Sequence, residues 1–354
     1  MSDAFTLLDD ASLEGRNTFR VPARAALLAD VNHADGFAEL FRYPVFEAGD
    51  PLVLGGGSNL LFAGDWPGPV LSIRAHGIHI VEDDGDSALV RAEAGVEWND
   101  LVHWTLARDL PGLENLALIP GTVGAAPIQN IGAYGVEIRE FVETVEAWDR
   151  DVGAIKRISA VDCDFGYRDS RFKRERDRWI VFAVEFRFPK QRELHLDYAG
   201  ITDELQRMGV GTPTQRTVAE AVSRVRTAKL PNPSVLGNAG SFFKNPVIPQ
   251  AQADALLAEH PELPNYATGD ETTRKLSAAW LIERGGWRGK RIGDAGVSEQ
   301  HALVLVNHGR ANGAQILDLA QQVARDVKQR FGVDLEPEPR IIGATWPAAD
   351  RSAS

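Results

Sequence analysis

No part of this sequence limits the possible folds more than the segment from Leu116 to Ile138, which is rich in glycine and proline and yet apolar. Its six glycines and prolines rule out long regular elements, and its apolar residues argue against a solvated loop. The segment must therefore lie over something buried, with backbone amides open to a phosphate or a flat ring system. The alternative is a glycine-rich crossover between two sheets. The candidate cofactor-binding residues are Ile119, Pro120, Gly121, Thr122, Gly124, Ala125, Gln129, Asn130, Gly132, Ala133, Tyr134 and Gly135, called here the long glycine segment.

A second run of glycines follows a short buried-type strand predicted over residues 51–54. Three glycines in a row let backbone N–H groups approach an anion, and the serine and asparagine after them add side-chain donors. The run lacks both the G-x-G-x-x-G pattern and a P-loop lysine, and a tight turn without ligand is the alternative. The candidate pyrophosphate-binding residues are Leu54, Gly55, Gly56, Gly57, Ser58 and Asn59, called here the short glycine loop.

Composition excludes several classes of protein. The 354 residues carry 38 Lys and Arg against 50 Asp and Glu, a net charge of −12, which argues against nucleic-acid or anionic-membrane binding as the main task. The single cysteine, Cys163, excludes a disulfide framework and a multi-thiolate metal site, and it fits a reducing compartment. No histidine pair has metal-ligand spacing, so no metal is expected. No secretory signal or membrane-spanning run is visible, which favours the cytoplasm.

The periodicity of apolar residues predicts a mixed α and β chain of more than one domain. Strands are expected over residues 25–31, 51–54, 70–73, 87–94, 142–149, 179–188 and 302–306. Helices are expected over 33–42, 97–108, 217–229, 250–259, 273–285 and 312–331. Thr217 and Glu220 have the spacing of a capping box at the start of one helix. The run Leu230 to Ser234, with two prolines, ends that helix and is the best candidate for a domain boundary.

Three short motifs hold candidate catalytic residues. Arg168 is a fixed cation suited to an oxyanion or carboxylate, unless it simply pairs with Asp169 on the surface. Ser241 lies between a glycine and two phenylalanines and lacks the G-x-S-x-G elbow, so it is better suited to deliver a proton than to attack as a nucleophile. Glu338 lies between two prolines on a rigid, extended path. Each of the last two also has a plain structural interpretation, as a turn serine and a linker carboxylate.

Taken together and in this order, the motifs resemble the UDP-N-acetylenolpyruvoylglucosamine reductase family (MurB) of bacterial peptidoglycan synthesis. The resemblance runs from Asn17 to Gly343, and its most specific stretches are IPGTVGAAPIQNIGAYGVE and GNAGSFFKNP. One departure is Pro339, where the family usually carries a small aliphatic residue. The insertion from Ile248 to Glu271 is similar to the longer, type I form of the family.

The resemblance implies an α+β fold of three domains. Two would form an FAD-binding unit similar to the PCMH and vanillyl-alcohol-oxidase proteins, and a smaller α/β domain would bind substrate. The implied ranges are 1–74, joined by the C-terminal 341–354, for the first FAD-binding subdomain, 75–229 for the second, and 230–340 for the substrate domain. The implied enzyme is a cytoplasmic FAD flavoprotein that uses NADPH to reduce UDP-N-acetylglucosamine enolpyruvate to UDP-N-acetylmuramate, an oxidoreductase acting on a CH–CH bond. Through peptidoglycan synthesis it would serve cell-wall biogenesis, cell shape, the cell cycle and cell division.

The resemblance also assigns roles to residues. Hydride would pass from reduced flavin to C3 of the enolpyruvyl ether, Arg168 would stabilise the enolate with help from Glu338, and Ser241 would protonate C2. Substrate would be held by Tyr167, Tyr198, Lys229, Asn245, Tyr266, Gln300 and Arg340, with Tyr198 over the nucleotide end and Lys229 and Asn245 at the diphosphate.

The expected partner is thus a small-molecule UDP-sugar, with no nucleic acid and no membrane, for a chain expected to be a monomer. Two other functions remain open from the sequence. One is a flavin oxidoreductase of the same architecture that oxidises a small alcohol or hydroxy acid. The other is a flavin- or nucleotide-binding module without catalysis.

Overall fold

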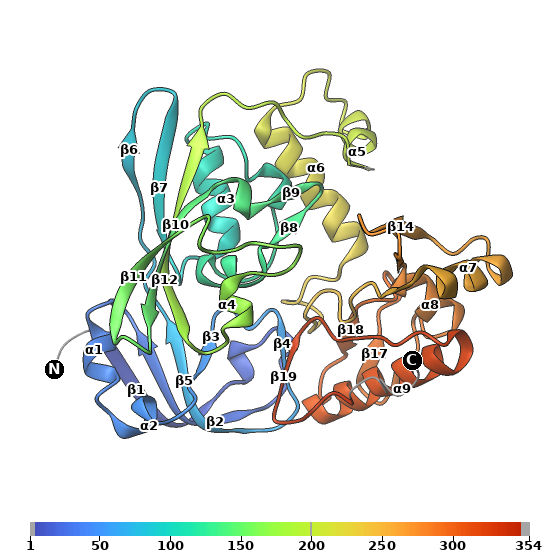
Figure 1. The fold of residues 1–354 in the computed structure, drawn as a ribbon, viewed down its shortest axis with the longest axis horizontal. Coiled ribbons are helices and arrows are strands. Elements are labelled where there is room, and N and C mark those ends of the chain that lie inside the picture. The colour runs from blue at the N-terminus through green and yellow to red at the C-terminus, as the bar shows by residue number, and fades with distance from the viewer. Residues whose placement is uncertain (1–3, 199, 348–354) are drawn as a thin grey trace. The chain divides into compact units, whose positions relative to one another are not determined.

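The computed structural model describes residues 4–198 and 200–347, drawn as a ribbon in Figure 1. The described chain divides into two compact units. Unit 1 comprises Met1–Ala11, Ala25–Gly56 and Pro67–Thr227, and unit 2 comprises Ser12–Arg24, Gly57–Trp66 and Ala228–Ser354. The predicted three-domain ranges stay a prediction, and the last seven residues of the segment 341–354 lie outside the described residues.

The first sheet of unit 1 has four strands in the order β1, β2, β5, β3. They span β1 (Phe5–Ser12), β2 (Arg24–Val31), β5 (Trp66–Ile73) and β3 (Leu52–Leu54), and two short helices, α1 (Gly36–Leu40) and α2 (Pro44–Glu47), follow β2. β3 runs parallel to β5, with Leu52 opposite Val70. Because β3 ends at Leu54, the short glycine loop leaves the sheet directly from a buried strand.

The second sheet of unit 1 is antiparallel, in the order β11, β10, β12, β7, β6 (Figure 1). The strands are β11 (Ala154–Ser159), β10 (Val142–Asp149), β12 (Trp179–Pro189), β7 (Ser87–Glu93) and β6 (Ile78–Asp83). The first eight residues of the central strand β12 are all buried, so both faces of the sheet are covered.

Two hydrophobic cores lie on the two sides of this sheet. On one side Phe37, from α1, stacks on Trp148 with ring centroids 5.7 Å apart, which joins the two sheets of unit 1. On the other, Trp98 of α3 (Trp98–Leu106) meets Phe186 at 6.1 Å, and helices α5 (Ile201–Arg207) and α6 (Gln215–Lys229) complete the core. The long glycine segment packs against this second core through Ile119, Ala133 and Tyr134.

Connections in unit 1 contain short elements that shape the candidate site. They are the 3-10 turns Glu114–Leu116, Val123–Ala125, Pro127–Gln129 and Ile138–Glu140, the hairpin β8 (Gly132–Ala133) and β9 (Val136–Glu137), and α4 (Arg171–Arg174).

Unit 2 is built around the helix α9 (Gly313–Phe331), which packs on β4 (Leu60–Phe62), β17 (Ala295–Val297) and β18 (Leu305–Asn307). Asn312 caps α9 in a capping box with Gln315, and Gly332 ends it in the left-handed region at φ 68°. The 3-10 turn Glu14–Arg16 also belongs to this unit. The remaining elements are β13 (Val247–Pro249), α7 (Gln250–Glu259), β14 (Asn265–Ala267), β15 (Thr273–Leu276), α8 (Ala278–Arg284), β16 (Arg291–Ile292) and β19 (Arg340–Ile342), which runs parallel to β4.

Most predicted elements are present, and β10 and α7 have the predicted bounds. The helix predicted over residues 273–285 is wrong in its first third, because Thr273–Leu276 form a strand paired with β13 and β14 on both sides. The predicted capping box is also wrong, because α6 begins at Gln215, and Thr217 instead donates to the Thr214 carbonyl at 2.9 Å.

None of the helices within residues 4–198 and 200–347 is both long enough and apolar enough to cross a membrane.

Candidate functional site

Within unit 1, Gly55 and Gly56 of the short glycine loop lie against the long glycine segment. A Cβ on Gly55 would lie 2.8 Å from the Thr122 hydroxyl oxygen, and a Cβ on Gly56 would lie 3.1 Å from the Cα of Gly121. Only residues without side chains allow two backbones to approach so closely. The two segments that the sequence predicts to bind a cofactor therefore form one surface of small residues, on which Gly55 and Ala125 are exposed.

Backbone hydrogen bonds hold this surface in place. The Trp98 amide donates to the Gly121 carbonyl at 2.8 Å, and the Val123 amide donates to Val96 at 2.9 Å. In contrast, no residue among 4–198 and 200–347 accepts a hydrogen bond from the amides of Gly56, Gly121 or Thr122. Converging backbone donors are the usual way that proteins bind phosphate. These residues therefore fit the pyrophosphate of FAD.

Other glycines of the long glycine segment are needed for packing within the protein. A Cβ on Gly124 would lie 2.5 Å from the Cβ of Ala94, and one on Gly132 would lie 2.7 Å from Glu137 Cγ. Gly135 has φ 84° and packs against the His195 ring. For these three positions the conformation of the chain alone explains the glycine.

Three candidate residues have left-handed backbones. Asn130, Tyr134 and Arg168 have φ of 45°, 51° and 53°. The Asn130 side chain stabilises this conformation, because its amide donates to the Gly166 carbonyl at 2.9 Å and its oxygen accepts from the Arg139 amide at 3.2 Å. Each such residue costs of the order of 1 kcal/mol or more, and such strain is commonly found at binding sites.

Arg168 does not form the surface ion pair that its sequence allows. Asp169 pairs with Arg174 instead, and no carboxylate of the described residues lies within ion-pair distance of Arg168. The guanidinium carbon lies 5.9 Å from the ring centroid of Tyr167, and the Lys173 ammonium donates to the Arg168 carbonyl at 2.7 Å. The half-buried cation is thus left available for an anionic ligand.

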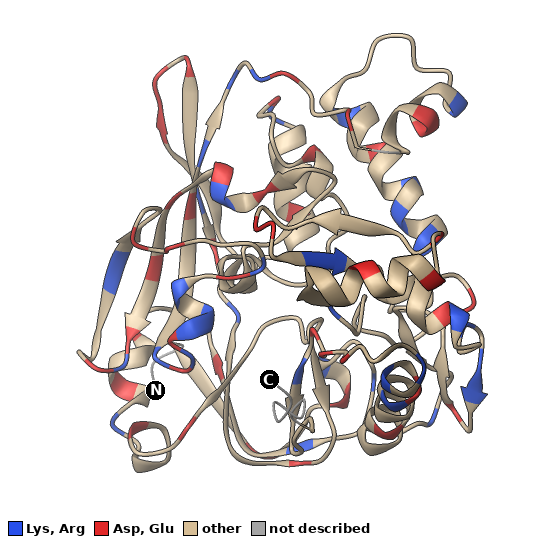
Figure 2. Ribbon diagram, turned by 45° about the vertical axis from the view of Figure 1, so that its right-hand side comes forward, with Lys and Arg blue, Asp and Glu red and all other residues tan. Residues whose placement is uncertain are grey.

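Arg226, on the last turn of α6, was missed by sequence reasoning. Burial lowers the pKa of its guanidinium, Tyr134 acts in the opposite direction, and the neighbouring charge of Arg168 lowers the pKa further. It has no carboxylate partner among the described residues. The sequence feature that could have identified Arg226 was its position three residues before Lys229, a predicted substrate-binding residue. Figure 2 shows basic residues along this helix.

Tyr134 and Tyr198 lie beside these cations. Their rings meet edge to face with centroids 5.2 Å apart, and burial raises the pKa of the Tyr134 hydroxyl. The side-chain NH2 group of Asn115 donates both to the Tyr134 carbonyl at 3.1 Å and to the His195 carbonyl at 2.9 Å. Unit 1 thus combines two unpaired guanidiniums with two tyrosines, an arrangement that suits an anionic ligand with a flat or apolar part.

Unit 2 brings Ser241 and Glu338 together. Ser241 pairs with Val304 in an antiparallel bridge, and the Phe242 amide donates to the Leu303 carbonyl at 2.7 Å. On the other side, the Glu338 amide donates to the Phe242 carbonyl at 2.8 Å. A hydroxyl and a carboxylate predicted to manage one proton therefore lie on adjacent extended segments.

The predicted substrate-binding residues of unit 2 lie on several elements. The Asn245 side-chain oxygen accepts from the Ala278 amide at 3.0 Å, so its NH2 group is the part left to a ligand. The Arg340 amide donates to the Asn59 carbonyl at 3.0 Å, and both residues belong to unit 2. Tyr266 is 49% exposed on β14, with the Lys275 ammonium 5.8 Å from its ring. Gln300 is held by a hydrogen bond from its amide to the Ser298 hydroxyl at 3.1 Å.

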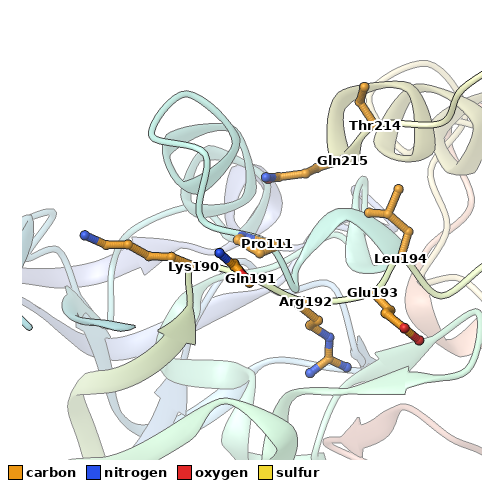
Figure 3. A pocket seen from close by; sticks show the side chains of 8 residues that line it. All are labelled: Pro111, Lys190, Gln191, Arg192, Glu193, Leu194, Thr214 and Gln215. Atoms are coloured by element: carbon orange, nitrogen blue, oxygen red, sulfur yellow. The ribbon is translucent and has the colours of Figure 1, made fainter. Parts of the chain in front are cut away.

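A pocket of about 610 Å³ in unit 1 contains none of the predicted site residues (Figure 3). Two of its cations are already paired, Lys190 with Asp83 and Arg192 with Glu140, both at 2.5 Å. The pocket therefore lacks the unpaired cations found near Tyr134. Its lining residues are Pro111, Lys190, Gln191, Arg192, Glu193, Leu194, Thr214 and Gln215.

Comparison with known proteins identifies the family. Residues 26–159 match an FAD binding domain, and residues 232–342 match the C-terminal domain of UDP-N-acetylenolpyruvoylglucosamine reductase. The reductase of that name from Xanthomonas campestris is 53% identical over 96% of this chain and 97% of its own length, and that of Xylella fastidiosa is 52% identical over 95% and 96%. The chain belongs to the UDP-N-acetylenolpyruvoylglucosamine reductase family.

A solved structure of a family member agrees with this result. The reductase from Thermus caldophilus has 25% sequence identity and a TM-score of 0.66, covering 96% of this chain and 98% of its own. The resemblance predicted from the motifs is thereby confirmed, as is the α+β class with an FAD-binding part and a separate C-terminal domain. The roles of individual residues stay predictions.

Proposed function

We propose that this protein is an NADPH-dependent oxidoreductase that reduces UDP-N-acetylglucosamine enolpyruvate to UDP-N-acetylmuramate, with FAD as its cofactor. The observation that carries the proposal is the 53% identity with reductases of that name over nearly the whole chain. The FAD binding domain match and the unpaired amides of Gly56, Gly121 and Thr122 support the cofactor. Bound FAD supplies the hydride-transfer chemistry, and NADPH is the reductant.

The residues of this chain provide for the charge and the proton. Arg168 stabilises the enolate that forms when the enolpyruvyl double bond is reduced, because a partly buried guanidinium favours negative charge strongly. Ser241 holds the proton that is delivered to C2. Glu338, on the segment adjacent to Ser241, assists the enolate. A serine hydroxyl is a weak acid, so we expect Glu338 to support this step as a relay or polarising group beside Ser241.

Substrate and cofactor are held by the remaining predicted residues. Lys229 and Asn245 bind the diphosphate, Tyr198 covers the nucleotide end, and Tyr167, Tyr266, Gln300 and Arg340 line the site. The short glycine loop and the long glycine segment hold FAD. We assign the chain to the type I form, on its insertion from Ile248 to Glu271, which folds as a strand and helix followed by β14.

The proposal also covers the compartment, the oligomeric state, the partners and the domain ranges of the protein. The protein acts in the cytoplasm as a monomer on a small-molecule substrate, with no nucleic-acid partner. Its three domains comprise residues 1–74 with the C-terminal segment, 75–229 and 230–340.

A spectrum of the purified protein tests the cofactor and the reductant. We expect a bound yellow flavin that NADPH bleaches under anaerobic conditions, and that regains its colour when UDP-N-acetylglucosamine enolpyruvate is added. A flavin that stays bleached with this substrate, and is reoxidised only by other acceptors, would mean a different flavin oxidoreductase. A protein without flavin would refute the proposal.

The variant Ser241→Ala tests the proton donor. We expect NADPH-dependent flavin bleaching at the wild-type rate, and turnover of the enolpyruvyl substrate slower by about two orders of magnitude or more, as for the loss of a general acid. Stopped-flow absorbance follows both half-reactions separately. An equal loss in both would show that Ser241 supports the fold of the site and does not deliver the proton.

A further inference from the structure

His301 is a titratable residue of unit 2 to which the proposed reaction gives no role. It lies on the turn between β17 and β18, next to Gln300. Its ring Nδ1 accepts a hydrogen bond from the Leu303 amide at 3.2 Å, and its carbonyl accepts from the Val304 amide at 3.0 Å. The ring is therefore fixed on the turn whose next residues pair with the Ser241 segment.

This hydrogen bond assigns the tautomer of the ring. Because Nδ1 accepts, the hydrogen of the neutral imidazole is on Nε2. Burial lowers the pKa of His301, and the charges of Lys229 and Arg288 lower it further, against a smaller opposite effect of Glu283. Burial thus favours the neutral form of the ring. No described residue accepts a hydrogen bond from Nε2, so the N–H donor of this half-buried ring is open to solvent or to a ligand.

The two cations near His301 differ in their partners. Arg288 pairs with Glu283 at 2.8 Å and donates to the Glu299 carbonyl at 2.7 Å, so its charge is already used. Lys229 has no carboxylate within ion-pair distance among the described residues. The cluster therefore offers one unpaired ammonium and one neutral directional donor, which together match neighbouring oxygens of a phosphate or diphosphate.

We propose that the Nε2–H of His301 donates a hydrogen bond to a phosphate oxygen of the nucleoside diphosphate sugar that Lys229 binds. This inference rests on the proposed function, because it takes the UDP-sugar as the ligand. A hydrogen bond to a charged acceptor contributes more than one between neutral groups, and an ammonium alone provides charge without direction. His301 would thus position the diphosphate and take no part in the chemical step.

Two matched variants separate this role from a structural one. His301→Asn keeps an acceptor near Nδ1 for the Leu303 amide and loses the distal donor. His301→Gln keeps a distal N–H donor and loses the Nδ1 acceptor. For UDP-N-acetylglucosamine enolpyruvate we expect His301→Asn to raise KM about ten-fold or more, with kcat within about two-fold, and His301→Gln to stay within about three-fold of wild type in both.

If His301 had a purely structural role, the order of the two variants would be reversed. The glutamine variant would then be the worse one, with a loss in kcat, because the turn beside Ser241 would move. That result, or a wild-type KM in His301→Asn, would overturn the proposal. In His301→Asn, inhibition by UDP should weaken by the same factor by which KM rises, whereas inhibition by uridine should not change. Equal weakening for uridine would also refute a phosphate contact.

Lys229→Met separates this inference from the proposed function. If Lys229→Met raises KM and His301→Asn does not, only the role of His301 is wrong. If the wild-type protein binds flavin but does not turn over the enolpyruvyl substrate, the proposed function itself is wrong.

Discussion

The close approach of Gly56 to Gly121 makes a quantitative prediction for Gly56→Ala. The new Cβ would lie 3.1 Å from the Gly121 Cα, whereas carbon atoms pack at about 3.5–4.0 Å, so the two segments must separate by roughly 0.4–0.9 Å. Such a shift moves an amide hydrogen bond of about 2.9 Å to the limit of a useful distance. Losing one such bond to a phosphate should weaken FAD binding about ten-fold or more, and overpacking should destabilise the fold by about 1–3 kcal/mol.

The measurement compares retained flavin after ultrafiltration, and Tm with and without added FAD, in Gly56→Ala and in Gly211→Ala. Gly211 is a matched control, because it lies in the same unit with nothing within 4 Å of its Cβ position and without positive φ. We expect the control to keep its flavin and to have an unchanged or slightly higher Tm. Wild-type flavin retention in Gly56→Ala would refute the proposal that the two glycine segments together hold FAD.

Two further predictions concern charge. Arg226→Met should raise the Tm of the flavin-free protein, measured by thermal melts, because it removes a half-buried unpaired cation beside Arg168. It should also raise KM for the enolpyruvyl substrate about ten-fold in steady-state kinetics. A lower Tm would show that Arg226 has a structural partner. Asp149, buried and bound by Arg178 at 3.1 Å, has a lowered pKa, chiefly because of that hydrogen bond. The ionised Asp149 carboxylate therefore stabilises the fold at pH values above the pKa that this carboxyl has in the unfolded chain, and this stabilisation is lost as pH falls below about 4. The difference in Tm between wild type and Asp149→Asn should therefore shrink below that pH. A deficit that does not change with pH would contradict this.

The sequence predicts elements best where local signals and tertiary pairing agree. β10, which contains Val142, Thr144 and Val145, and α7, after Pro249, have the predicted bounds. The segment from Thr273 to Leu276 behaves differently, since it becomes a strand by pairing with segments about ten and about twenty-five residues away. Its local helix signal begins only with the cap at Ser277. Strands such as β6 and β11 at the edges of the second sheet were missed because their faces are largely exposed.

The residues of the candidate site divide in the same way, into those that the local sequence predicts and those that only the folded structure identifies. Glycine-rich motifs predict the surface formed by the two glycine segments, because close backbone approach requires glycine. Arg226 could not be distinguished by sequence from the other arginines of α6, because its relevance comes from its position beside Tyr134 and Arg168 in space. The structural need for Gly124 and Gly135 was likewise hidden, since it depends on Ala94 and His195.

The left-handed backbones of Asn130, Tyr134 and Arg168 have a consequence for laboratory evolution of this protein. Glycine at Arg168 relieves the conformational energy of the folded chain, so a selection for heat tolerance alone should enrich it there. At Tyr134 the lost packing of the ring opposes the same gain. The same clones would lose a side chain that we propose to contact the ligand. A screen that couples survival at high temperature to turnover would instead keep both side chains, and comparing the two screens would map where this molecule trades robustness for activity.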